Sequence, residues 1–106
     1  MARVLAVVTD LMLASRVSTG LQGAGHEVRQ VADPPAEATD VDLIVADLDS
    51  VDPESLASLG PPVIGFHQHT DVETKRRAEA AGVAIVVPRS RMVRELPELA
   101  ERALAG

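Results

Sequence analysis

The chain has 106 residues, which suffices for one layered domain spanning residues 1–106 but not for two domains. Its composition, with 46% hydrophobic and 25% charged residues, is typical of a soluble globular protein, whereas a net charge of −6 and a single aromatic residue disfavour nucleic-acid binding. The absence of cysteine excludes disulfides, thiolate metal sites and cysteine nucleophiles.

The N-terminal part of the chain predicts a strand, a helix and a second strand. Residues 3–8 form a β-branched apolar run that ends near Asp10. This run is too short for a membrane span and unlike a signal peptide, so we expect a cytoplasmic protein with no membrane partner. Residues 13–21 then place an apolar side chain at every fourth position, as on one face of a helix. Residues 27–32 alternate like a strand exposed on one side, and residues 33–35 (Asp-Pro-Pro) interrupt it.

The middle of the chain predicts two buried strands with a short helix between them. Residues 41–47 are almost entirely aliphatic, which is typical of a strand covered on both faces of a parallel sheet. Asp52, followed by Pro53, predicts the start of a helix that ends near Gly60. Residues 63–66 then predict the next strand, which runs into His67.

The C-terminal part predicts a helix, a strand and a final helix. Thr70 and Glu73 have capping-box spacing, which predicts a helix over residues 70–81. Residues 83–87 predict the last strand. Residues 92–104 predict the last helix, in which Pro97 marks either a kink or the true first turn.

Strand and helix therefore alternate five times, although the second helix is nearly deleted because only about one turn fits before Asp40. Such alternation predicts an α/β fold in which helices cover both faces of a five-stranded parallel sheet. Ligands bind such sheets beyond the carboxyl ends of the strands, where Asp10, Asp47, His67 and Arg89 fall.

Three stretches resemble the receiver domain of the two-component response regulators. Residues 67–90 carry the pattern D-x-E-T-x-x-R-A-x-x-A-G, which is similar to the family's helix-then-strand segment before a closing Lys-Pro. Residues 41–47 resemble the family's third strand and put Asp47 on the phosphoacceptor position. Residues 21–28 resemble the turn into the second strand. The resemblance implies a doubly wound, flavodoxin-like (CheY-like) fold and a role in signal transduction.

Most of the family's site positions differ in this chain. The family's acid pair for Mg²⁺ is represented by Asp10 alone, and His67 stands where the family has Ser or Thr. Arg89, whose guanidinium group is planar and bulkier than an ammonium, replaces the closing Lys, and Val86 replaces the aromatic switch residue. Since only Asp47 is plainly retained, the resemblance is to a degenerate receiver.

Each acid at this site has two interpretations. Asp47 is either a phosphoacceptor or a strand-end acid that accepts loop amide hydrogens or pairs with Arg89, and we favour the pair with Arg89. Asp10 and Asp49 either complete a three-carboxylate Mg²⁺ cluster with Asp47 or act separately, Asp10 as the cap of the first helix and Asp49 as a solvated loop acid. The cap is favoured for Asp10.

His67 and His69 lie two residues apart and could face the same side of an extended segment to bind a metal. No third nitrogen or sulfur ligand accompanies them, so a hydrogen-bonded structural role is favoured for His67. We expect no catalytic residue, no bound metal and no cofactor.

The sequence therefore predicts a stand-alone pseudo-receiver that is not an enzyme and acts in signalling through protein–protein contacts, without phosphorylation. Its partner is another protein or a second copy of the chain, met through the last strand and helix with residues 89–94. One alternative is a divergent receiver phosphorylated on Asp47 with Mg²⁺. The other is a flavodoxin-like domain that binds a small ligand or nucleotide.

Overall fold

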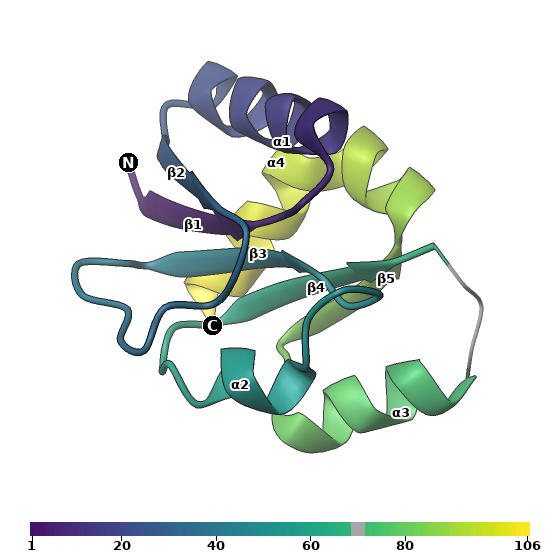
Figure 1. Cartoon of the computed structure of the whole chain (residues 1–106). Coiled ribbons are helices and arrows are strands. Elements are labelled where there is room, and N and C mark those ends of the chain that lie inside the picture. The colour runs from purple at the N-terminus through teal and green to yellow at the C-terminus, as the bar shows by residue number, and fades with distance from the viewer. Residues whose placement is uncertain (69–71) are drawn as a thin grey trace.

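The structure, a computed structural model, describes residues 1–68 and 72–106. Five parallel strands form one sheet, as predicted, and their order is β2-β1-β3-β4-β5 (Figure 1). The strands are β1 (Arg3–Val7), β2 (Glu27–Val31), β3 (Leu43–Asp47), β4 (Val63–His67) and β5 (Ile85–Pro88), and the helices are α1 (Leu11–Gly23), α2 (Pro53–Ala57), α3 (Val72–Ala81) and α4 (Arg89–Ala105).

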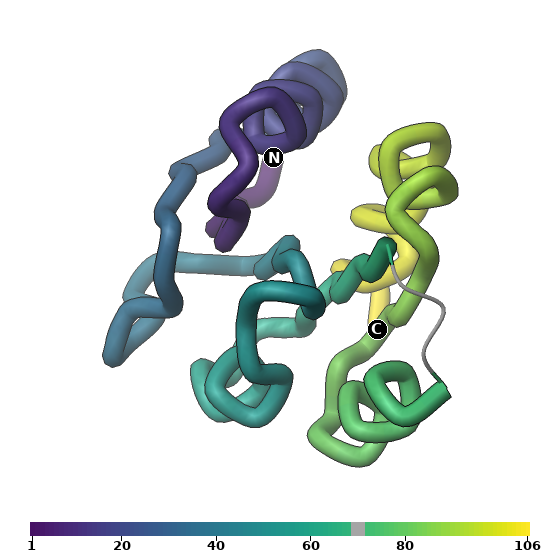
Figure 2. Tube along the Cα trace, turned by 45° about the vertical axis from the view of Figure 1, so that its right-hand side comes forward, coloured from purple at the N-terminus to yellow at the C-terminus, as the bar shows by residue number. Residues whose placement is uncertain are grey.

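Helices cover both faces of the sheet. Figures 1 and 2 show α1 and α4 on one side, with α2 and α3 on the other. Strand β1 serves both layers, because Val4 and Ala6 pack towards α1 and α4 whereas Leu5 and Val7 pack towards α2 and α3. This two-sided burial explains why the central strands are almost entirely aliphatic.

No helix forms between β2 and β3, which confirms the predicted loss of the second helix. Pro34 and Pro35 account for this, since each lacks an N–H and restricts the residue before it to an extended backbone. The sheet face beneath is nevertheless covered. Leu5 and Val7 are fully buried, and Val41 from the connecting segment packs against the same apolar cluster.

Three predicted boundaries need correction. The third strand begins at Leu43 rather than residue 41, and the last strand begins at Ile85 rather than residue 83. The last helix begins at Arg89 rather than residue 92, directly after Pro88. That helix kinks at Glu95 (φ −118°, ψ 18°), so Pro97 lies in the first turn of its second segment, where a missing N–H breaks no bond. The capping box predicted at Thr70 lies outside the described residues.

Candidate functional site

The carboxyl ends of β1, β3, β4 and β5 carry the polar residues expected at the site. Neighbouring strands end at similar heights, since Asp47 is in register with Phe66 of β4 and His67 with Pro88 of β5. The chain then places Asp10 and Arg89 at the starts of α1 and α4. The parallel sheet therefore gathers the predicted residues at one end, as the sequence suggested.

Asp10 is the N-cap of α1. Its Oδ1 accepts the backbone N–H groups of Met12 (3.0 Å) and Leu13 (3.1 Å), which confirms the favoured interpretation. Its Oδ2 lies 3.6 Å from a guanidinium nitrogen of Arg89. Both carboxylate oxygens of Asp10 are therefore engaged within the chain.

The prediction that Arg89 forms an ion pair with Asp47 is wrong, because Arg89 pairs with a different acid. The guanidinium of Arg89 contacts Asp10 and donates a hydrogen bond to Oε1 of Gln68 (3.0 Å). Arg89 opens α4, and α4 packs against α1 on the same face of the sheet, so the capping acid of α1 is within its reach.

Asp47 accepts hydrogen bonds from its own loop. The N–H of Asp49 donates to Oδ1 (2.9 Å), and the hydroxyl of Ser50 lies 3.4 Å from Oδ2. Burial raises the pKa of the Asp47 carboxyl above its usual 3.8, and the charge of Asp49 adds to this, whereas the two hydrogen bonds and a weak attraction from Arg89 oppose it. Asp47 thus has the predicted strand-end role in which it accepts a loop amide hydrogen.

Asp49 has a contact that the sequence did not indicate. Its Oδ2 accepts the backbone N–H of Gln68 at 2.7 Å, so Asp49 joins the loop after β3 to the end of β4 and is not simply a solvated acid. Together with the contacts above, this produces a continuous chain of polar contacts, which we call the strand-end network. Its members are Asp10, Asp47, Asp49, Gln68 and Arg89.

A residue outside the network holds its loop in place. Leu48 follows β3, donates its N–H to the carbonyl of Phe66 (2.8 Å) and packs its side chain over Gly65 of β4. A Cβ on Gly65 would lie 2.7 Å from a side-chain carbon of Leu48. The missing side chain of Gly65 therefore makes the space that positions Leu48 between Asp47 and Asp49.

No protein-family model matches the sequence, and no curated protein matches it significantly. Solved structures do match. A receiver domain protein (CheY-like) from Methanospirillum hungatei shares 20% identity at a TM-score of 0.86, covering 99% of this chain and 94% of that one. Chemotaxis response regulator CheY4 of Vibrio cholerae shares 24% sequence identity at a TM-score of 0.80, and the match covers 98% of this chain and 99% of that one. NtrX from Brucella abortus, solved in complex with ADP, shares 22% sequence identity at a TM-score of 0.80. That match covers 98% of this chain but only 26% of the NtrX chain.

The chain has the fold of a response-regulator receiver domain. Within this receiver fold, His67 ends β4 and is buried, with 8% of its surface exposed. The metal-binding alternative for His67 requires His69, which lies outside the described residues. Val86 of β5 packs beside the apolar cluster under α2 and α3, so a small aliphatic side chain occupies the position that the resemblance gives to the family's aromatic switch.

The acids at the strand ends do not form the three-carboxylate cluster considered for Mg²⁺. Among residues 1–68 and 72–106, no three His, Asp or Glu side chains gather closely enough to hold a metal ion. Asp10 is engaged by two amides and Arg89, and Asp49 by the amide of Gln68. The cluster of Asp10, Asp47 and Asp49 that the sequence offered as one interpretation is therefore not assembled among the described residues.

No helix in the part of the chain that the structure describes combines the length and apolar character needed to cross a membrane.

Proposed function

We propose that this protein is a pseudo-receiver: a domain with the receiver fold that signals through protein–protein contacts, is not an enzyme and is not phosphorylated. The strand-end network carries this proposal. Where the resemblance calls for groups that hold Mg²⁺ and a phosphoryl oxygen, Asp10, Asp49 and Arg89 each contact another segment of the same chain.

The electrostatics at Asp47 also argue against phosphoryl transfer. Transfer to a carboxylate needs cations that neutralise the incoming charge, and divalent metals usually provide them. Here no three-acid cluster gathers among the described residues, and the guanidinium of Arg89 already lies against Asp10 and Gln68. Burial further raises the pKa of Asp47, so the environment already disfavours one negative charge there. A network satisfied without phosphate maintains a single conformation.

Exposed apolar side chains beside the network support the protein-contact part of the proposal. Leu11 and Met12, at the start of α1, are 77% and 78% exposed. Both adjoin Asp10, whose carboxylate contacts Arg89 at the start of α4. Further along α4, Arg91 and Arg94 contact Glu95 (3.4 and 3.1 Å). Exposed apolar residues next to charged ones are typical of protein-interaction surfaces, and α4 is the helix through which the sequence predicts a partner.

Incubation with acetyl phosphate and Mg²⁺, followed by intact-mass measurement, tests the absence of phosphorylation. We expect no added phosphoryl group on the wild-type chain and none on Asp47→Asn. A mass gain that occurs in the wild type and disappears in Asp47→Asn would overturn the proposal and establish the phosphorylatable alternative.

One cleft favours the small-ligand alternative. Between α1 and α4 lies an opening of about 590 Å³ whose lining includes Arg16, Arg89 and Ser90, groups suited to an anionic ligand. A thermal-shift screen with ADP, ATP and inorganic phosphate tests it. A ligand at 100 times its Kd adds about 2.7 kcal/mol to the stability, so absence of any shift removes this alternative. The cytoplasmic location stays a prediction.

A further inference from the structure

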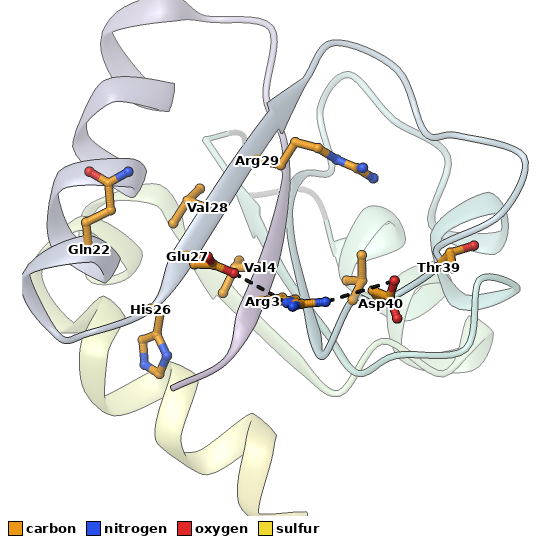
Figure 3. Close-up of a pocket in the computed structure, with 10 residues that line it drawn as sticks. Arg3, Val4, Gln22, His26, Glu27, Val28, Arg29, Thr39 and Asp40 are labelled. Atoms are coloured by element: carbon orange, nitrogen blue, oxygen red, sulfur yellow. Dashed lines mark ion pairs between the residues drawn. The ribbon is translucent and has the colours of Figure 1, made fainter.

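The lost second helix leaves a groove beside β2. The groove has a volume of about 550 Å³ and is lined by residues of β1, β2 and the segment before β3. Figure 3 shows Arg3 at its centre, paired with Glu27 (3.3 Å) and Asp40 (3.9 Å), while the side chain of Arg29 extends away from them. Within residues 1–68 and 72–106, Arg29 forms no ion pair of its own. The groove therefore offers an uncommitted cation next to an outer strand.

Strand β2 has a free long edge. In the described sheet it pairs with β1 alone. The N–H of Glu27 donates to Ala2 (2.9 Å), and the carbonyl of Val31 accepts from Val8 (3.1 Å), so residues 27, 29 and 31 direct their backbone groups to β1. Because backbone direction alternates along a strand, the N–H and C=O groups of Val28 and Gln30 point outwards. Such groups can pair with another strand.

The charges of β2 match those of a second copy of the same strand. Glu27 and Arg29 lie on one face of β2, on either side of Val28. If two copies pair antiparallel about a two-fold axis at Val28, Glu27 of each copy lies opposite Arg29 of the other. A two-fold axis at Arg29 would instead place two arginines opposite each other, which is unfavourable. Only the register centred on Val28 combines outward backbone groups with opposite charges.

We propose that the protein self-associates through β2, with two copies pairing antiparallel about Val28 to give a continuous ten-stranded sheet, twice the five strands of one copy. The contact is isologous, so each charge match occurs twice. A five-residue strand pair buries little surface, and each copy carries a net charge of −6, so the dimer is weak and forms at high protein concentration. This surface is separate from α4, where the sequence predicted a homodimer.

Sedimentation equilibrium from about 10 μM to about 1 mM protein, at about 0.15 M salt, tests the dimer. Arg29→Glu places like charges opposite each other at two points, and we expect it to raise the dissociation constant at least about tenfold. Glu27→Arg should have the same effect. The double variant Glu27→Arg/Arg29→Glu restores opposite charges across the axis and should restore the dimer.

Arg16→Glu is the matched control, since it makes the same charge change on α1, away from β2, and should leave the dimer unchanged. Amide hydrogen exchange of the wild type gives a second readout that needs no variant. Protection of the Val28 and Gln30 amides should increase with protein concentration. Three outcomes would overturn the proposal. The wild-type chain could stay monomeric at every concentration, the dimer could be unaffected by Arg29→Glu, or it could be weakened by Arg16→Glu and not by Arg29→Glu.

Discussion

At the carboxyl ends of the strands, Asp10, Asp49 and Arg89 each contact another segment of the chain. At the outer edge of β2, by contrast, Arg29 has no ion pair among the described residues, and the backbone groups of Val28 and Gln30 point outwards. Both regions differ from what the resemblance to the receiver family implies, the first in its side chains and the second in having no helix between β2 and β3. The groups at the strand ends are therefore already engaged within the chain, whereas those at the edge of β2 are open to another molecule.

The difference follows from where the polar groups lie. At the strand ends they lie close together and satisfy one another. At β2 the proline-containing segment covers the apolar sheet face, whereas the outer strand edge is open in the described sheet because β2 stands at the end of the strand order. Backbone groups of an edge strand find partners only on another strand, in water or on a ligand. New contacts are therefore expected at β2 rather than within the strand-end network.

Gly65→Ala disturbs the network region by crowding Leu48, and it has the largest effect that we expect among these variants. The new Cβ would lie 2.7 Å from Leu48, which would have to move together with the loop between Asp47 and Asp49. We expect a loss of about 1–3 kcal/mol in the free energy of unfolding, as for other overpacked cores. Urea denaturation measures it.

Gly23→Ala is the matched control, because nothing lies within 4 Å of a Cβ at Gly23 in α1. It should be neutral or stabilise by up to about 1 kcal/mol. Equal stability of Gly65→Ala and the wild type would mean that Leu48 does not anchor the loop.

Asp10→Ala separates the capping role of Asp10 from its ion pair. The substitution leaves the amides of Met12 and Leu13 without their acceptor and should cost about 1–2 kcal/mol by urea denaturation. Asp10→Asn retains a good capping group but loses the charge facing Arg89. Because that pair is long and partly exposed, Asp10→Asn should cost less than about 1 kcal/mol. Equal costs for the two variants would make the ion pair the dominant interaction, because both lose it and only Asp10→Ala also loses the cap.

The fold could be predicted because its signals are local. Aliphatic runs mark the buried strands, and Pro34-Pro35 explains why no second helix forms. The partners at the site were harder to predict, because they depend on which loops meet. Family resemblance assigned Arg89 to Asp47, yet the packing of α4 on α1 brings it to Asp10. Nothing in the sequence links Asp49 to Gln68, since a backbone amide can serve as a donor at almost any residue.

The smallest effect that we expect is in the pH dependence of stability, which tests the environment of Asp47. Burial raises the pKa of this carboxyl above 3.8, so folding favours its protonated form. The stability that this preference contributes is fully present below the unfolded-state pKa and is lost as the pH rises through the folded-state pKa. Asp47→Asn cannot ionise and retains an oxygen to accept the Asp49 amide. The variant should therefore gain stability relative to the wild type as the pH rises from about 3 to about 7.

Urea denaturation at several pH values measures this difference, and Asp33→Asn provides the control, since Asp33 is an exposed acid in the segment after β2. Its difference from the wild type should change less with pH than that of Asp47→Asn. If Asp47→Asn instead loses stability relative to the wild type as the pH rises, the carboxylate is stabilised by its surroundings. In that case the strand-end network favours a negative charge at Asp47, and the electrostatic argument against phosphorylation of Asp47 would fail.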